Sequence, residues 1–355
     1  MSEPKLNRLP ARTWNWLRMN ESLLNLAPAE AGCMPAVSGL AQPAVWTADA
    51  PLPEGWNEIE TGMGPDFDAY LYETALFALE APEGAVLSQP VVLDFTYPEG
   101  SRLASRVYLH AGKDSVLPVI LLLRGNAELA ALQTRVRAEE GAKVTVYAVE
   151  LLSEKAVCLN DLGGVCAEGA SMELVKLELG AAQNYAGTAA SLAGKGSQFR
   201  ANVGYRVPTG RKLDMNYVIR HYGEKTHSQL DVSGVLEEDA AKLFRGTIDF
   251  PKGCKGAKGN EQETVLLLGE RQVNQTIPLI LCQEEDVEGN HGATIGRLEE
   301  RVLFYLASRG ISRKAAENMI ARAKLDAVCG LIPSEEVRDL VWAFLGDERE
   351  DGDGE

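Results

Sequence analysis

Hydrophobic and polar residues alternate with a period of two along the middle of the chain, from about residue 88 to 282. In SQFRANVGYRV (197–207) the apolar residues of one face are Phe199, Ala201, Val203, Tyr205 and Val207. KLDMNYVIRH (212–221) repeats the pattern with Leu213, Met215, Tyr217 and Ile219. Because successive side chains of a strand point to opposite faces, both stretches are predicted to be strands with one buried face.

Glycine-containing turns separate these predicted strands, and no helical pattern lies between them. A doubly wound sheet needs helices between its parallel strands, so that fold class is excluded. A sandwich, a barrel and a solenoid remain. A β-helix stacks coils around one continuous core. It therefore accommodates roughly 200 residues of alternating strands and turns more easily than one sandwich does. The chain has no strict repeat, and from the pattern alone the β-helix and the sandwich stay equally open.

The chain before this region has a different pattern. Residues 5–25 are predicted to form a helix, with apolar contacts from Trp14, Leu17, Leu23, Leu24 and Leu26. The stretch 27–66 contains six prolines, which fix φ and remove backbone donors, so an irregular extended segment is expected there. DAYLYETALFALEAP (68–82) is predicted to form one short helix that ends at Pro82.

A helical period returns after residue 296. Leu298, Val302, Tyr305 and Leu306 share one face of a first helix, in which Leu303 and Leu306 are expected to be core residues. Gly310 stands where a left-handed residue would end that helix. Ser312 and Ser334 are predicted to cap two further helices. The acidic stretch GDEREDGDGE is expected to be disordered.

These patterns divide the chain into four regions. They are an N-terminal helical and extended region (1–84), a β core (85–290), a C-terminal helical domain (291–346) and a disordered acidic tail (347–355).

The net charge is −16, which argues against binding of nucleic acid or docking on an anionic membrane, because both need basic patches. No apolar run reaches the ~20 residues that a membrane-spanning helix requires. The first thirty residues contain polar groups throughout, so no signal peptide is expected. A cytoplasmic location is therefore predicted.

The six cysteines form no C-x-x-C pair, and we expect them to be reduced and mostly buried. His221 and His227 have no standard metal-ligand spacing, and we interpret them as structural or surface residues. The chain has no GxxxxGK[ST] motif, so it should not itself hydrolyse ATP.

His291 lies between an asparagine and Gly292, immediately before the first C-terminal helix, and a tight turn is expected there. A neutral imidazole is a good iron ligand and titrates near neutral pH. The alternative from the residues alone is that His291 bonds a backbone carbonyl at this turn.

The run HGATIGRLEERVLFYLASRGISRKAAENMI (291–320) resembles the C-terminal motif of the SufB/SufD family of iron–sulfur cluster assembly proteins. HYGEKTHSQLDVSGVLEEDAAKLFRGTIDF (221–250) and ETVLLLGERQVNQTIPLIL (263–281) also resemble that family, and the resemblance covers roughly residues 85–330. His-Gly-Ala-Thr-Ile-Gly at 291–296 is similar to the SufD branch. That branch often has a cysteine at the position of Gly289, so one thiolate of the family pattern is missing here.

The resemblance implies a right-handed parallel β-helix with N-terminal and C-terminal helical segments. It implies a scaffold subunit that is not an enzyme and that pairs edge-on with a SufB-like subunit. The C-terminal helices would bind a SufC-like ATPase. No cofactor would be tightly bound by this chain, although an iron–sulfur cluster could form transiently in the complex.

The residues expected to bind partners are His291, Gly292, Thr294, Phe304, Tyr305, Arg309 and Gly310. The resemblance implies that His291 lies at the SufB interface, opposite a cysteine of that subunit, and it is the candidate cluster or metal ligand. Two other functions stay open: a SufB-like scaffold that carries the cluster as a homodimer, and a β-helix polysaccharide-active enzyme. Little or no colour after anaerobic iron and sulfide loading of the chain alone would separate a SufD-like from a SufB-like protein.

Overall fold

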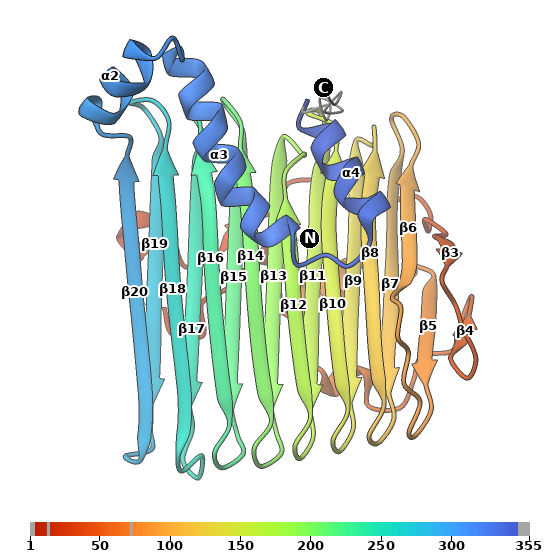
Figure 1. The fold of residues 1–355 in the computed structure, drawn as a ribbon. Coiled ribbons are helices and arrows are strands. Elements are labelled where there is room, and N and C mark those ends of the chain that lie inside the picture. The colour runs from red at the N-terminus through yellow and green to blue at the C-terminus, as the bar shows by residue number, and fades with distance from the viewer. Residues whose placement is uncertain (1–3, 13–14, 72–73, 347–355) are drawn as a thin grey trace, which may run out of the picture.

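A computed structural model describes residues 4–12, 15–71 and 74–346 of the chain. Its body is a parallel β-solenoid in which consecutive strands alternate between two nine-stranded sheets (Figure 1). We call them the even sheet and the odd sheet, after the strand numbers of the solenoid body. The prediction of a β-helix is confirmed, and the sandwich alternative is wrong, because the body strands pair in parallel within each sheet.

The even sheet consists of β6 (Val91–Tyr97), β8 (Val116–Gly125), β10 (Lys143–Leu152), β12 (Ser171–Glu178), β14 (Gln198–Val207), β16 (His227–Leu236), β18 (Ala257–Leu267) and β20 (Val287–Arg297), with β3 (Ala36–Ser38) at one edge. The odd sheet consists of β5 (Leu76–Ala81), β7 (Arg102–Ala111), β9 (Leu129–Ala138), β11 (Val157–Cys166), β13 (Gln183–Leu192), β15 (Lys212–His221), β17 (Ala241–Phe250) and β19 (Val273–Cys282), with β4 (Val45–Thr47) at the edge.

The core lies between the two sheets and follows the predicted alternation. The apolar residues predicted to face inward from β14 and β15 are all buried in one continuous cluster. Strands β5 to β16 contribute inward-facing side chains to this cluster, whereas β17 and β18 contribute one buried residue each and β19 and β20 contribute none; the opposite side chains of each strand form the outer faces of the solenoid. The period-two pattern of the sequence therefore predicted the buried face of β14 and β15 correctly.

One corner of the solenoid is built from a stack of left-handed residues. Gly141, Gly169 and Gly196 occupy it in successive turns, with φ angles of 65–70°. The backbone N–H of Gly141 donates to the carbonyl of Glu168 at 2.9 Å, and that of Gly169 donates to the carbonyl of Lys195 at 3.0 Å. Glycine is favoured here because a left-handed backbone costs it no side-chain strain.

The predicted helix over residues 5–25 is wrong. This segment contains β1 (Lys5–Leu6), the short 3₁₀ helix η1 (Asn15–Leu17) and β2 (Ser22–Leu23), and β1 and β2 pair in antiparallel fashion. Asn7 and Arg18 have positive φ angles, which interrupt a right-handed helix. Trp14, which was predicted to contribute to this helix, lies outside the described residues.

The predicted helix over 68–82 is also wrong. The short helix α1 (Pro65–Tyr70) includes only the first three residues of this range, 68–70, and Leu76–Ala81 forms strand β5. The rest of the N-terminal region, which includes the 3₁₀ helix η2 (Trp56–Glu58), packs on the outer face of the odd sheet. Met63 and Phe67 contact Leu129 and Leu159 in one cluster there, and this burial orders the proline-containing segment.

Three C-terminal helices are present as predicted: α2 (Glu300–Ser308), α3 (Arg313–Cys329) and α4 (Glu335–Phe344). Ser312 and Ser334 accept hydrogen bonds from the N–H groups of Ala315 and Val337, which confirms both caps. The boundary drawn at residue 291 falls inside strand β20, so the helices begin only at Glu300. The predicted tail, 347–355, lies outside the described residues.

Helices α3 and α4 run back over the outer face of the even sheet (Figure 1). Val328, Val341 and Trp342 pack there on a cluster that includes Ile120 and Leu177. Among the described helices, none is long and apolar enough to cross a membrane.

Candidate functional site

The two ends of the solenoid differ. At the N-terminal end the edges of the sheets are the three-residue antiparallel strands β3 and β4, and Trp46 of β4 stacks on Phe77 with ring centroids 5.6 Å apart. At the C-terminal end β19 pairs only with β17, and β20 pairs only with β18. Two strands therefore present free edges at this end, and free backbone donors and acceptors are a template for pairing with another chain.

His291 lies in the middle of β20, in register with Glu261 of β18. The expected tight turn is wrong, since the strand continues to Arg297. Gly289 is on the inner face, because a Cβ there would meet the Phe250 ring of the core at 3.0 Å. His291, two residues on, has the same orientation, yet it is exposed because no further turn covers it. It has no hydrogen bond or ion pair with another described residue, so the ring is available.

Gly292 and Thr294 lie on the opposite, outer face of the same strand. A Cβ at Gly292 would stand 2.6 Å from Oε1 of Gln262, so the glycine allows β20 to lie flat against that side chain. Thr294 is exposed. The predicted interface residues of the strand therefore share one edge but not one face.

The last turns of the solenoid contain buried charges behind this edge. Lys242 and Glu263 form a short, fully buried ion pair. Thr276 donates to Glu263 at 2.7 Å and accepts from Lys242 at 3.0 Å. Glu261 is 3% exposed and makes no hydrogen bond with a described residue. Burial, together with the neighbouring Glu263 carboxylate, raises the pKa of Glu261 to about 8.

The sequence interpretation missed this charged cluster. Glu261 and Glu263 continue the inward positions of Ala257 and Gly259 in β18. The sequence feature that could have revealed the cluster is therefore the presence of two acidic residues, Glu261 and Glu263, at positions that the period-two pattern assigns to the core. Such positions normally hold apolar residues, and a buried charge is costly unless it is paired.

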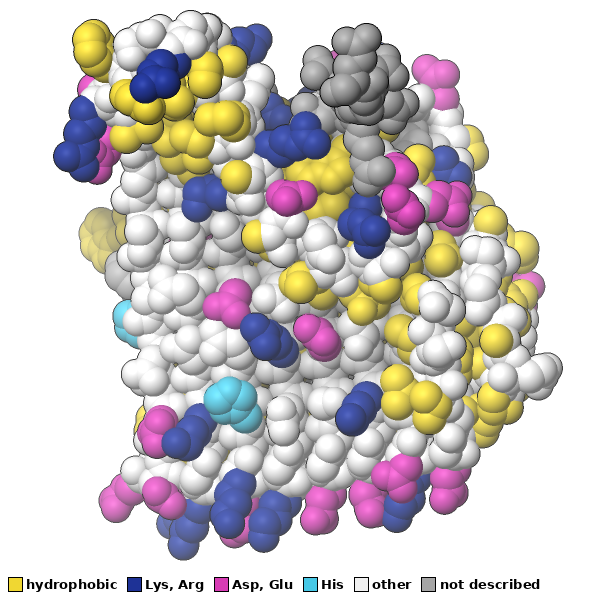
Figure 2. Space-filling view, viewed as in Figure 1, with side chains coloured by type: hydrophobic (Ala, Val, Ile, Leu, Met, Phe, Trp, Pro, Cys, Tyr) yellow, Lys and Arg dark blue, Asp and Glu magenta, His cyan; other side chains and the backbone are white. Residues whose placement is uncertain are grey.

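Helix α2 forms an exposed apolar surface next to the free edge. Phe304 is 77% exposed and Tyr305 is 55% exposed, and the Arg309 guanidinium lies 5.1 Å from the centre of the Tyr305 ring. Gly310 ends the helix with φ +83°, as predicted. Leu303 is buried as predicted, whereas Leu306 is only half-buried, and Val302 of the predicted apolar face is exposed. Figure 2 shows hydrophobic side chains gathered over this helix, interspersed with basic ones.

The predicted residues thus fall into two adjacent groups. His291, Gly292 and Thr294 lie on β20, and Phe304, Tyr305, Arg309 and Gly310 lie on or next to α2, which follows β20 directly. Figure 1 shows α2 beyond the end of β20, away from the body of the even sheet.

The remaining histidine and cysteine predictions can be placed as well. His221 is buried, with its two ring nitrogens 2.8 Å from Thr226 Oγ1 and 2.9 Å from Ser228 Oγ. Burial lowers the pKa of His221 to about 4, with a smaller contribution from His227, so it is a neutral structural residue. All six cysteines are free, and only Cys282 is exposed. The described residues contain no group of three histidine, cysteine or acidic side chains placed to hold a metal ion.

Known proteins match this chain in the region just described. The family model for the SufBD core domain of the SUF system for iron–sulfur cluster assembly matches residues 95–324. The SufD protein of Bacillus subtilis (strain 168) is 29% identical over 127 residues, which are 36% of this chain and 29% of that protein.

The SufB protein of the same strain is 25% identical over 171 residues, 48% of this chain and 37% of the relative. A SufBD family protein of Mycobacterium leprae is 27% identical over 131 residues, 37% of this chain and 15% of the relative. The chain thus aligns with at most 37% of the length of any of these three relatives. Since the family model covers more than half of the chain, the protein belongs to the SufBD core family of the SUF system for iron–sulfur cluster assembly.

Proposed function

We propose that the chain is a SufD-like, non-enzymatic scaffold subunit of a cytoplasmic iron–sulfur cluster assembly complex. It pairs through its open solenoid end with a SufB-like subunit and binds a SufC-like ATPase through α2 and its surroundings. The observation that carries the proposal is the asymmetry of the solenoid: its N-terminal edges are antiparallel strands of three residues each, whereas its C-terminal edges are strands of 10 and 11 residues.

The chemistry of the open end suits this role. Main-chain groups of β19 and β20 can continue both sheets into a partner, which gives affinity and alignment at once. His291 would then stand at the junction of the two subunits. Its neutral imidazole is a suitable ligand for iron, and the cluster itself is the cargo of the complex.

Helix α2 supports the second contact. Exposed aromatic and arginine side chains are the residue types that most often anchor protein interfaces. Phe304, Tyr305 and Arg309 stand together there, and Phe304 is too exposed to contribute much to the stability of the protein itself.

A SufB-like homodimeric scaffold is the second candidate, because the aligned region is longer with the Bacillus subtilis SufB protein than with its SufD protein. The two candidates differ in what the chain does alone. A SufB-like scaffold should acquire visible absorbance after anaerobic loading with iron and sulfide, whereas a SufD-like subunit should stay almost colourless without its partner.

The decisive experiment co-expresses the tagged chain with untagged SufB-like and SufC-like proteins and measures the mass of the purified complex. We expect both partners to co-purify. A tagged chain that captures the ATPase but not the SufB-like subunit would contradict the proposed role of the open end. A chain that captures neither would overturn the proposal as a whole.

A further inference from the structure

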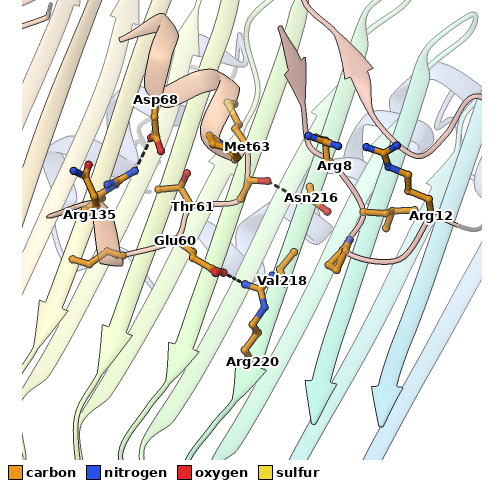
Figure 3. A pocket seen from close by; sticks show the side chains of 17 residues that line it. Arg8, Arg12, Glu60, Thr61, Met63, Asp68, Arg135, Asn216, Val218 and Arg220 are labelled. Atoms are coloured by element: carbon orange, nitrogen blue, oxygen red, sulfur yellow. Dashed lines mark hydrogen bonds and ion pairs between the residues drawn. The ribbon is translucent and has the colours of Figure 1, made fainter. Parts of the chain in front are cut away.

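A walled pocket of about 510 Å³ lies on the outer face of the odd sheet, beneath the N-terminal region (Figure 3). Its floor is formed by Asn216, Val218 and Arg220 of β15. The loop 60–65 forms one wall, and the segment 8–12 forms another. The free edges and α2 do not contribute to it, so this pocket is separate from the proposed partner-binding site.

The wall formed by the loop 60–65 is held rigidly. The N–H of Met63 donates to the buried Asp161 carboxylate at 2.9 Å, and the Met63 carbonyl accepts from Asn7 N–H at 3.2 Å. The loop lies directly on the sheet because Gly187 has no side chain: a Cβ there would stand 2.4 Å from Met63 N. A rigid wall means that the pocket exists before any ligand arrives.

Besides Thr61 Oγ1, two buried polar atoms at the pocket have no hydrogen-bond partner among the described residues. Asn216 is fully buried, and its amide nitrogen donates to the Gly62 carbonyl at 2.7 Å, which fixes the amide orientation. Its Oδ1 is left without a donor. The Nε of Arg135 likewise has no acceptor, although its terminal nitrogens bind Asp68 and the carbonyl of Trp56. Buried polar groups are almost always hydrogen-bonded, so these two atoms indicate a missing polar partner.

Four arginines, Arg8, Arg12, Arg135 and Arg220, line the pocket against two carboxylates, Glu60 and Asp68, so the lining is positive in a protein whose net charge is −16. Arg8 and Arg12 belong to an ion-pair network that extends beyond the lining. Lys5, Arg8 and Arg12 share one carboxylate, that of Glu21, and Lys5 alone lies at hydrogen-bonding distance, 2.7 Å. The guanidinium groups of Arg8 and Arg12 are 3.7 and 3.8 Å from the other Glu21 oxygen, which itself has no hydrogen bond. Both arginines therefore retain donors for an anion.

We propose that this pocket binds a small hydroxylated organic anion, whose carboxylate or phosphate meets Arg8 and Arg12 and whose hydroxyl group donates to Asn216. The rigid walls and the limited volume fit a small molecule rather than a peptide or a nucleic acid. Arginine pairs equally well with carboxylate and phosphate, so both headgroups belong to the same ligand chemistry. The inference does not depend on the proposed function.

The test uses isothermal titration of the full chain at fixed ionic strength with two matched pairs of probes. Citrate and tricarballylate differ by one hydroxyl group on a carboxylate skeleton. Glycerol 3-phosphate and propyl phosphate differ by hydroxyl groups on a phosphate skeleton. We expect one pair to bind, with the hydroxylated member about tenfold tighter, because a buried acceptor left unpaired costs about that factor. The pair that binds identifies the headgroup.

Variants of the rim complete the test. Arg8→Gln and Arg12→Gln should each weaken binding of the better probe about tenfold, since each removes a charge-assisted hydrogen bond. Both side chains are partly exposed, so the variants should melt at the temperature of the unmodified chain. Arg200→Gln, which removes an exposed arginine from the even sheet, is the matched control and should change nothing.

Three outcomes would overturn the proposal. In the first, none of the four probes binds at millimolar concentration. In the second, Arg200→Gln weakens binding as much as the rim variants do, so that the attraction is only general electrostatics. In the third, the probes without hydroxyl groups bind as tightly as their matched partners.

Discussion

At the scale of single residues, His291 combines exposure with an inward orientation, because the solenoid ends at its strand. We expect His291→Ala to leave stability within about 0.5 kcal/mol, as for surface substitutions that remove no contact. In a complex reconstituted with SufB-like and SufC-like partners, cluster formation should fall strongly. Iron and sulfide per complex measure the effect.

The matched control for this variant is His227→Ala. His227 is also exposed, but it begins β16, which has a neighbouring strand on both sides and so does not lie at the free edge. It should leave cluster formation unchanged. Full cluster yield with His291→Ala would mean that the imidazole has no role in assembly, even if the edge still pairs.

The buried Lys242–Glu263 pair behind the edge permits a second prediction. Lys242→Met leaves the Glu263 carboxylate buried with Thr276 as its remaining hydrogen-bond donor among the described residues, and should lower the free energy of unfolding by about 3–5 kcal/mol. Adding Glu263→Gln removes the uncompensated charge and should restore a large part of that loss. Urea unfolding of Lys242→Met, Glu263→Gln and the double variant, compared with the unmodified chain, measures the coupling. A double variant no more stable than Lys242→Met would argue against the ion pair.

At the scale of elements, α2 differs from α3 and α4. The last two cover apolar side chains of the even sheet, such as Ile120 and Leu177, so removing all three helices would uncover part of the core. A substitution on α2 is therefore a cleaner test of ATPase binding. We expect Phe304→Ala to reduce capture of the SufC-like ATPase at least about tenfold, as loss of an interface anchor does, without changing the melting temperature.

Leu331→Ala is the control for that experiment. Leu331 is 44% exposed and follows α3, outside the α2 surface. Its substitution should leave ATPase capture intact. Equal losses in both variants would indicate that the ATPase contacts a broader area than α2.

The way each element packs also explains which elements could be predicted from the sequence. Strands β14 and β15 alternate over ten residues each, and every apolar residue that was assigned to the inner face lies in the core. The N-terminal segment has apolar residues without a period, because Leu6 and Leu9 pack into two separate clusters on the outer face of the odd sheet. Because these residues pack against two separate surfaces, their spacing does not follow the period of a helix or a strand, and it cannot be recognised from a short stretch of sequence.

The candidate site was predictable only in part. His291 was found through a family resemblance, whereas its strand was missed, because an exposed last strand needs few apolar residues and NHGATIG contains two glycines. The pocket beneath the N-terminal region was missed altogether. Its walls come from segments near residues 10, 62 and 218, and only the tertiary fold brings them together.

At the scale of the whole molecule, the solenoid has long free strands at its C-terminal end only, because its N-terminal edges are strands of three residues, which offer few backbone groups for pairing. Two chains that meet open end to open end form a closed dimer, whereas two open ends would allow fibres. We therefore expect the isolated chain to dimerise as its concentration rises and to form no larger species. Sedimentation velocity measures this, and a SufB-like partner should compete with the dimer.

Ile295→Lys tests whether the open end makes that contact. Ile295 is 50% exposed on the inner face of β20, and a lysine at an edge strand opposes pairing because its charge would be buried between two chains. The variant should stay monomeric at concentrations where the unmodified chain is dimeric. Val86→Lys changes a residue that is 67% exposed and lies outside the last turn, so it should still dimerise. If Ile295→Lys dimerises like the unmodified chain, self-association uses another surface, and the free strands would then have to be reserved for a different partner.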